Sequence, residues 1–262
     1  MIKNASLVVV GTGIKFLSHL TVEARAYIEQ SDKVLFLVND PGMKQWISKT
    51  NPQSESLDFL YSKFSLRKYC YQAITEYILQ TVKEIKHVCV VLYGHPCVFA
   101  QIGIDAVNLA KKEGFYAKLL PGISSADCLF SDLLIDPGSH GCHSFEATDF
   151  LLYKRKFDPR SHLILYQADI IGVLGNPRVH NNKKGAELLI RYLSDFYTLN
   201  HKVILYEAAQ YPSFEAKIEQ YSLGSLMEAA FSRITTLYIP PCNNNEYDHK
   251  MLEELGINAF DL

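Results

Sequence analysis

The stretch SLVVVGTG, residues 6–13, is a short apolar run that ends directly in a glycine-containing turn. Its β-branched residues predict a buried strand. A second stretch of this kind, HVCVVLYGHP at 87–96, ends in a glycine–histidine–proline turn. Glycine at the carboxyl end of a parallel strand lets a ligand approach the backbone, although a plain strand-to-helix turn explains either stretch alone. Together they predict an α/β protein with a binding site along one sheet edge.

The residues around these two stretches repeat the alternation of strand and helix. Further apolar runs at 33–38 and 117–120 predict buried strands. The segments 21–30, 71–85 and 101–114 have the periodicity of amphipathic helices, and Thr21 is suited to cap the first of them. This alternation favours a mainly parallel sheet.

The chain changes character after residue 118, so we predict two α/β domains, 1–118 and 119–262. Strand-like runs occupy 161–166, 202–208, 216–223 and 235–241, with a helix pattern at 184–197. Because the runs at 202–208 and 216–223 follow each other after a short turn, they favour antiparallel pairing. The Gly- and Asn-rich stretch 171–185 indicates an exposed excursion, and the basic stretch 154–160 is typical of a solvated face.

Composition places the chain among ordinary globular proteins. Of its 262 residues 48% are hydrophobic and 21% charged, and the net charge is −2. We therefore expect no electrostatic attraction to nucleic acid or to an anionic membrane. The first apolar run is too short for a membrane span or a signal peptide. Six scattered cysteines without a CxxC pair predict reduced thiols in a cytoplasmic protein and no metal site.

The first glycine turn does not match the common nucleotide-binding motifs. A dinucleotide fingerprint requires a third glycine where this chain has Phe16. The turn also lacks the GxxxxGK[ST] pattern of a phosphate-binding loop. Its ligand must therefore be inferred from a wider set of motifs.

Five blocks of the sequence, taken in order, resemble the tetrapyrrole-methylase superfamily. They are LVVVGTGI, LTVEARAYIEQSDKVLFLV, VLYGHPCVFA, LLPGISSADCLFSDLLIDP and TTLYIPP, and together they span nearly the whole chain. The resemblance implies two α/β domains with S-adenosylmethionine in the cleft between them and S-adenosylhomocysteine as product. It implies these donor-site residues: Gly11, Gly13, Tyr93, Gly94, His95, Pro96, Val98, Phe99, Ser124, Ser125, Gln167, Tyr206, Glu207, Ala208 and Thr236.

Within that superfamily the chain is most similar to the borosin methyltransferases, which N-methylate backbone amides of a ribosomally made peptide. His95 stands where porphyrinoid-modifying enzymes have aspartate. In the borosin family a tyrosine, an arginine and a second tyrosine precede a YGHP motif at fixed spacing. Tyr61, Arg67, Tyr71 and Tyr93 match that spacing here. The resemblance implies that these four residues are catalytic.

The same resemblance also implies which partners the chain binds. SFEA at 144–147 and the IPP sequence near the end also match the borosin pattern. Because the chain ends soon after that sequence without a Val/Ile-rich extension, it resembles the split type, which acts in trans on a separate precursor. The family implies a homodimer and a precursor with a small helical recognition domain.

The chemistry explains why such residues are needed. A peptide nitrogen is a poor nucleophile because its lone pair is delocalised into the carbonyl. Arg67 and Tyr71 are i and i+4 if this segment is helical, and a guanidinium beside a phenol favours the phenolate. We expect Tyr71 to accept the amide proton while Tyr61 and Tyr93 donate hydrogen bonds to the developing imidate oxygen, although the sequence leaves open which tyrosine is the base.

Several alternatives remain open from the sequence alone. Tyr71 alone would more often be a core residue, and Arg67 alone a surface ion pair; only their joint spacing favours catalysis. Tyr69 is interpreted as a packing residue and His95 as a structural or donor-positioning residue. The rival functions are a tetrapyrrole or other small-molecule methyltransferase and a non-catalytic peptide-binding scaffold.

Overall fold

The computed structural model describes residues 5–61, 63–175, 183–242 and 247–258. The chain forms two compact units, each built from discontinuous segments. The first comprises Met1–Ile135, Gly172–His180 and Tyr206–Ile218, and the second comprises Asp136–Ile171, Asn181–Leu205 and Glu219–Leu262. Each unit contains helices and one five-stranded sheet, so the predicted α/β class is confirmed.

The first unit is built on a parallel sheet. Its order is β3-β2-β4-β1-β5, and every pair of neighbours runs parallel. The four predicted strands are confirmed with small shifts at their ends, whereas the short edge strand β3 was not predicted. The strands are β1 (Ser6–Gly11), β2 (Lys33–Leu37), β3 (Ser54–Ser56), β4 (His87–Leu92) and β5 (Tyr116–Leu119).

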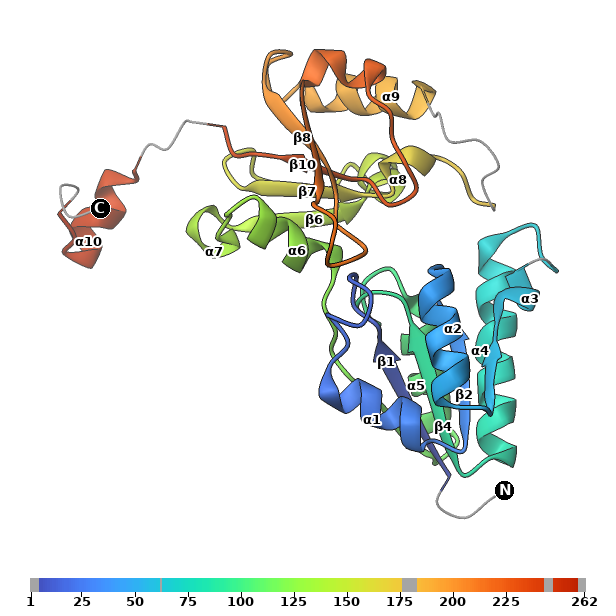
Figure 1. Cartoon of the computed structure of the whole chain (residues 1–262). Coiled ribbons are helices and arrows are strands. Elements are labelled where there is room, and N and C mark those ends of the chain that lie inside the picture. The colour runs from blue at the N-terminus through green and yellow to red at the C-terminus, as the bar shows by residue number, and fades with distance from the viewer. Residues whose placement is uncertain (1–4, 62, 176–182, 243–246, 259–262) are drawn as a thin grey trace. The chain divides into compact units, whose positions relative to one another are not determined.

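Helices cover both faces of this sheet because its strands are apolar on both sides. Helices α4 (Arg67–Glu84) and α5 (Gln101–Lys112) share a core with Val9 and Val90. The neighbouring residue Val8 points to the opposite face, where α1 (Val22–Gln30) and α2 (Pro41–Thr50) pack. Figure 1 shows these helices, in blue to green, around the strands of the first sheet.

The helix starts follow ordinary capping chemistry. Thr21 accepts a hydrogen bond from the Ala24 amide at 3.1 Å, so the predicted cap of α1 is confirmed. Asp40 caps α2 in the same way through the Met43 amide. Helix α4 begins at Arg67, four residues earlier than its apolar stripe predicted. Two shorter helices, α3 (Asp58–Tyr61) and α6 (Ser125–Asp132), complete the helices of this unit.

The second unit contains a mixed sheet of order β6-β7-β10-β8-β9. Strands β6 and β7 are parallel, and β7 and β10 are antiparallel. The predicted strands at 161–166, 202–208, 216–223 and 235–241 are confirmed, and β8 and β9 are neighbours as expected; β6 was not predicted. The bounds are β6 (Cys142–Glu146), β7 (His162–Tyr166), β8 (Lys202–Glu207), β9 (Lys217–Ser222) and β10 (Thr236–Ile239).

Helices and an aromatic cluster surround this mixed sheet. Helix α9 (Lys183–Leu193), predicted at 184–197, packs Leu189 against the same core as Phe150 of α8 (Ala147–Leu152). Phe157 lies between Phe150 and Tyr197 in this core. The remaining elements are α7 (Pro137–His140), η1 (Ala168–Ile170), η2 (Leu223–Glu228) and α10 (His249–Leu255).

Two later segments of the chain return to the first unit. The Arg67 amide donates to the Leu174 carbonyl, and Leu66 forms a bridge with Gly175. The Phe16 amide donates to the Gln210 carbonyl at 2.7 Å. The first unit therefore continues past residue 118, where the sequence-based domain boundary was placed, and includes the described beginning of the excursion at 171–185.

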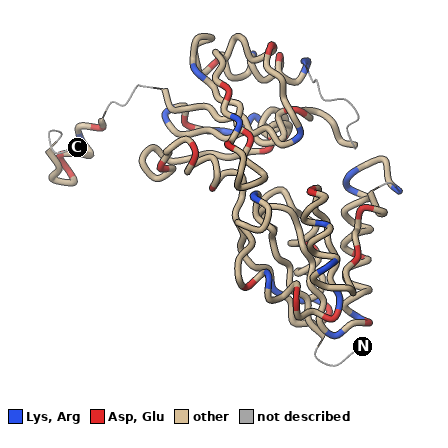
Figure 2. Tube along the Cα trace, viewed as in Figure 1, with Lys and Arg blue, Asp and Glu red and all other residues tan. Residues whose placement is uncertain are grey.

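The surface of the chain carries both signs of charge. Figure 2 shows that the positions of basic and acidic residues alternate along the trace of both units. Arg155 of the basic stretch 154–160 pairs with Asp149, and Arg160 pairs with Asp158. Within the described ranges, no helix is both long and apolar enough to cross a membrane.

Candidate active site

The two glycine turns at the ends of β1 and β4 lie against each other. Gly13 and Gly94 exchange backbone hydrogen bonds at 3.2 and 3.1 Å, and both have positive φ. A Cβ on Gly11 would lie 2.1 Å from the Gly94 carbonyl oxygen. Close packing of the two turns therefore requires these glycines, whatever ligand the turns bind.

His19 holds the first turn in place. Its Nδ1 accepts hydrogen bonds from the amides of Ile14 and Lys15 at 3.3 and 3.1 Å. Burial, and secondarily the charge of Lys15, lowers the pKa of His19, which favours the neutral ring that can accept these bonds. Sequence reasoning missed His19, because nothing in its local pattern distinguishes it from a surface histidine.

His95, in the second turn, is also occupied by the backbone. Its Nδ1 accepts a hydrogen bond from the Cys97 amide at 3.0 Å. This hydrogen bond fixes the orientation of the ring within the turn and occupies Nδ1. The geometry therefore favours the structural role expected for His95 over a role as general base.

The loop after β4 exposes apolar side chains. Val98 is 36% and Phe99 45% exposed, although both are hydrophobic. Phe99 has φ +52°, a left-handed conformation that a bulky residue rarely adopts. Gln167, at the end of β7 in the second unit, also has positive φ. Strained backbone of this kind costs about 1–3 kcal/mol and concentrates at binding sites.

Other residues that the resemblance assigns to the donor site have structural partners. Ser124 caps α6 in a reciprocal capping box with Asp127. The buried Tyr206 donates a hydrogen bond to Asp132 at 2.6 Å, and burial followed by that bond raises the pKa of its phenol. Four further assigned residues are at least partly buried: Ser125, Glu207, Ala208 and Thr236.

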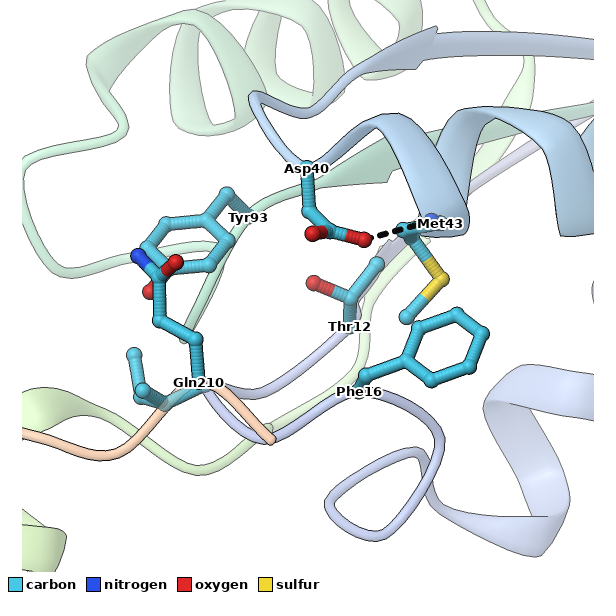
Figure 3. A pocket seen from close by; sticks show the side chains of 7 residues that line it. Thr12, Phe16, Asp40, Met43, Tyr93 and Gln210 are labelled. Carbon is cyan, nitrogen blue, oxygen red and sulfur yellow. Dashed lines mark hydrogen bonds between the residues drawn. The ribbon is translucent and has the colours of Figure 1, made fainter. Parts of the chain in front are cut away.

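A small pocket opens beside Tyr93. Its volume is ≈ 10 Å³, which is room for about one water molecule. Figure 3 shows the Tyr93 ring beside the Gln210 side chain, with the Asp40 carboxylate on the other side of the pocket. The full lining is Thr12, Ile14, Phe16, Asp40, Met43, Tyr93 and Gln210.

Tyr93 is held by residues that sequence reasoning missed. Burial raises the pKa of its phenol, and a hydrogen bond with Gln210 acts in the opposite direction. Asp40 accepts hydrogen bonds from the Met43 amide and from the Tyr211 hydroxyl. Gln210 and Tyr211 could not be predicted here because they lie far along the chain, in the segment that returns after β8. The Asp40–Pro41 pair was a usable signal, since it is typical of a helix start.

Tyr61, Arg67 and Tyr71 come together at the start of α4. The Tyr61 and Tyr71 rings meet edge-to-face with centroids 6.3 Å apart. Arg67 lies one turn from Tyr71 and donates from its guanidinium to the Val173 carbonyl at 2.6 Å. Burial, and secondarily interaction with Tyr71, raises the pKa of Tyr61 well above its ordinary value, while Arg67 opposes the shift.

The fourth predicted catalytic residue lies on the other face of the sheet. Tyr61 and Tyr71 pack against the core under α4 and α5. Tyr93, which directly follows β4, packs against the core under α1 and α2. Side chains alternate between the two faces along a strand, so Tyr93 points away from the core that contains its neighbour Leu92 and that Tyr61 and Tyr71 pack against. The structure thus groups three of the four residues and places Tyr93 with Gln210 and Asp40.

Comparison with known proteins gives the family. The model of the tetrapyrrole (corrin/porphyrin) methylases matches residues 6–226. The chain therefore belongs to this family, in agreement with the ordered blocks of its sequence.

Curated relatives confirm the resemblance to borosin methyltransferases. A methyltransferase/lentinulin A precursor from Lentinula edodes is 36% identical over 97% of this chain and 62% of its own length. A methyltransferase/type I borosin precursor from Gymnopilus junonius is 37% identical over 97% of this chain and 61% of its own. A methyltransferase/type III borosin precursor from Anomoporia bombycina is 34% identical over 98% of this chain and 30% of its own length. The chain thus spans less than two thirds of the length of these relatives.

Solved structures share the fold at low identity. Uroporphyrin-III C-methyltransferase from Thermus thermophilus matches with a TM-score of 0.63 and 18% identity, over 90% of this chain and 94% of that one. A cobalt precorrin-4 methyltransferase matches with a TM-score of 0.63 and 15% identity, over 90% of this chain and 95% of that one. The Thermus enzyme is also known in complex with S-adenosylhomocysteine. These matches support the fold class.

Proposed function

We propose that this chain is an S-adenosylmethionine-dependent methyltransferase that N-methylates backbone amides of a ribosomally made peptide. The observation that carries the proposal is the convergence of Tyr61, Arg67 and Tyr71 at the start of α4. These are three of the four residues that the borosin spacing singles out. The curated relatives, whose names combine methyltransferase with cyclic peptide precursor, support the same reaction.

The methyl donor fits the exposed and strained parts of the site. When bound, S-adenosylmethionine would supply an electrophilic methyl group on a sulfonium centre. Aromatic faces and backbone carbonyls suit such a diffuse positive charge, and Phe99 offers an exposed ring on a strained loop. We assign the donor to the residues that the resemblance implies, from Gly11 and Gly13 through Gln167 and Thr236.

Tyr61 and Tyr71 have different roles in the proposed proton transfer. Because the pKa of Tyr61 is raised, its hydroxyl keeps its proton at neutral pH and can donate to the amide oxygen. Tyr71, one helical turn from Arg67, is the base in this proposal: its oxygen accepts the proton as the amide N–H bond breaks. The nitrogen would gain the methyl group as the S–CH₃ bond breaks, with the electron pair of that bond left on sulfur. The negative charge that develops on the amide oxygen is then stabilised by Tyr61 before it disappears with the transfer.

Tyr93 takes part in the same proposed reaction, although it packs on the other face of the first sheet from Tyr61 and Tyr71. Its phenol, with a pKa raised by burial, also keeps its proton at neutral pH. It therefore donates hydrogen bonds and does not accept the amide proton. Gln210 and the pocket residues fix the direction in which it donates.

We propose that the peptide is a separate precursor with a small helical recognition domain, modified in trans in the cytoplasm by a homodimer. The names of the relatives join methyltransferase and precursor in one chain, so the alternative is modification within a single chain. Mass spectrometry of the purified chain and the added peptide after incubation with donor separates these cases. A mass gain of CH₂ units on the chain itself would contradict action in trans.

The catalytic assignment is tested by substitution. Tyr71→Phe and Arg67→Ala should each abolish methylation of the peptide, because one removes the proposed base and the other removes the guanidinium one helical turn away from it. Calorimetry with S-adenosylhomocysteine should show donor-site binding close to that of the wild type. Tyr69→Phe is the matched control, since Tyr69 is on the same helix and 53% exposed. Methylation at the wild-type rate in both variants would refute the assignment.

The same assay separates the rival functions. Turnover of a small acceptor without any peptide would indicate a small-molecule methyltransferase. Failure of the wild-type chain to bind S-adenosylhomocysteine would indicate a scaffold.

A further inference from the structure

Asp40 joins two parts of the first unit through the two oxygens of one carboxylate. One oxygen accepts a hydrogen bond from the Met43 amide at 2.6 Å and so caps α2 (Figure 3). The other oxygen accepts a hydrogen bond from the Tyr211 hydroxyl. Because Met43 and Tyr211 are far apart in sequence, this carboxylate ties the start of a helix to a loop that returns to the unit late in the chain.

Tyr211 belongs to the loop between β8 and β9, residues 208–216. A loop lacks the ladder of hydrogen bonds that holds a strand in place, so its position depends on a few specific contacts. The Phe16 amide donates to the Gln210 carbonyl at 2.7 Å, and the centroids of the Phe16 and Tyr211 rings are 5.8 Å apart. Together with the bond to Asp40, these contacts hold Gln210 and Tyr211 beside the first glycine turn and the start of α2.

The start of α2 approaches Tyr211 closely because residue 42 is a glycine. A Cβ at Gly42 would lie 3.1 Å from a carboxylate oxygen of Asp40 and 3.6 Å from the Tyr211 hydroxyl. The first distance is shorter than an ordinary van der Waals contact, so a side chain here would press against the carboxylate. The glycine leaves room for the bond, and a hydrogen bond to an ionised carboxylate is stronger than one between neutral groups.

The position of this loop matters because Gln210 precedes Tyr211 and bonds to Tyr93. The hydrogen bond from Gln210 lowers the pKa of Tyr93, which means that the phenol oxygen is the acceptor. Tyr93 therefore keeps its own O–H group for donation, and Gln210 fixes the direction of that donation. A shift of the loop would take Gln210 away from the phenol.

Asp40 also acts on Tyr93 through its charge. Both side chains line the same pocket of ≈ 10 Å³. After the larger effect of burial, the negative charge of Asp40 raises the pKa of Tyr93. A thiolate at Cys128 of α6 would raise it too, but burial raises the pKa of that thiol to about 11, so it is neutral at pH 7. Gln210 and Asp40 thus shift the pKa of Tyr93 in opposite directions.

We propose that Asp40 and Tyr211 are positioning residues for Tyr93: their hydrogen bond fixes the loop that places Gln210 against the phenol. The proposal rests on the function proposed above, in which Tyr93 donates a hydrogen bond during methylation of the peptide amide. Asp40 and Tyr211 affect the reaction through Tyr93 and need not touch the peptide or the methyl donor.

Substitutions at the two ends of this bond should change Tyr93 in opposite directions. Tyr211→Phe keeps the ring and removes the hydroxyl, so Gln210 is no longer held against Tyr93 and the pKa of Tyr93 should rise. Asp40→Asn still caps α2 and can donate from its NH₂ group to the Tyr211 oxygen, but it removes the charge, so that pKa should fall. NMR titration of ring-labelled tyrosine in the full chain, with Tyr93→Phe to assign the signal, measures both shifts.

Kinetics with a synthetic peptide rich in Val and Ile add a second measurement. Tyr211→Phe should lower kcat about three- to tenfold with little change in the KM for the peptide, because Tyr93 acts on the reacting amide. Tyr77→Phe is the matched control: the Tyr77 hydroxyl also donates to a carboxylate, that of Glu55, at 2.7 Å, and Tyr77 does not line the Tyr93 pocket. This control should keep the wild-type kcat and the wild-type titration of Tyr93.

The outcomes separate this proposal from the proposed function. Opposite shifts of the Tyr93 pKa, with a reduced kcat in Tyr211→Phe, would support the positioning role. An unchanged titration in both variants, shifts of the same sign, or a wild-type kcat in Tyr211→Phe would overturn it. If the wild-type chain does not methylate the peptide although the opposite shifts are present, the peptide function fails and the positioning of Tyr93 stands.

Discussion

Tyr61 and Tyr93 differ from surface tyrosines in the pKa of the phenol, which burial raises in both. The charge of Arg67 lowers the pKa of Tyr61, but by less than burial raises it. In Tyr93 the Gln210 hydrogen bond offsets part of the shift. Both hydroxyls are therefore held as hydrogen-bond donors by their surroundings, and neither is suited to be the base.

Gln210 is predicted to tune Tyr93. Gln210→Leu removes the hydrogen bond that opposes the effect of burial, so the pKa of Tyr93 should rise further above its ordinary value. NMR titration of ring-labelled tyrosine, with Tyr93→Phe to assign the signal, measures the shift directly. Gln72→Leu, an exposed glutamine on α4, serves as control. A Tyr93 titration identical to that of the wild type would show that Gln210 has no such role.

At the scale of elements, the start of α4 depends on a segment more than a hundred residues away in sequence. Residues 173–175 pair with Leu66 and Arg67, and the Val173 carbonyl accepts from the Arg67 guanidinium at 2.6 Å. Because this contact fixes the direction of the arginine, it also determines how its charge faces the tyrosines. The stretch 171–185, interpreted from sequence as an exposed excursion, therefore contributes to the candidate site through its first residues.

Gly175→Ala should disturb this pairing. A Cβ at residue 175 would lie 2.8 Å from the Ser65 carbonyl oxygen, so the two segments must separate. We expect a reduction in methylation of at least tenfold, because a small misplacement of Arg67 is sufficient for such a loss. Thermal unfolding should change by only a few degrees. Gly224→Ala, whose Cβ would make an ordinary 3.4 Å contact, is the control; equal activity of both variants would contradict the prediction.

At the scale of the whole molecule, several buried tyrosines make stability sensitive to high pH. Burial raises the pKa of Tyr61, Tyr197 and Tyr206 above the ordinary value of 10.0, and in Tyr206 the bond to Asp132 adds to the shift. Above pH 10 the unfolded chain releases these protons while the folded chain keeps them. The unfolded state then binds fewer protons, so stability is complete below pH 10 and falls as the pH rises further.

Urea unfolding as a function of pH tests this expectation. Each buried tyrosine should contribute up to about 1.4 kcal/mol per pH unit to the fall in the free energy of unfolding above pH 10. Tyr206→Phe should reduce that slope and also lower stability at neutral pH, because Asp132 loses its partner. Tyr69→Phe should change neither quantity. A slope in Tyr206→Phe equal to that of the wild type would refute the assignment.

The sequence by itself determined the α/β class, most of the strands, the glycine turns and the family, because these depend on local periodicity and short motifs. The resemblance to the borosin spacing also indicated that Tyr61, Arg67 and Tyr71 belong together, and helical spacing supports this for Arg67 and Tyr71, which are i and i+4. Tertiary structure decided that Tyr93 packs on the opposite face and that Gln210, Asp40 and Val173 hold the site. These contacts join residues distant in sequence, so no local pattern encodes them; they form only when the chain packs.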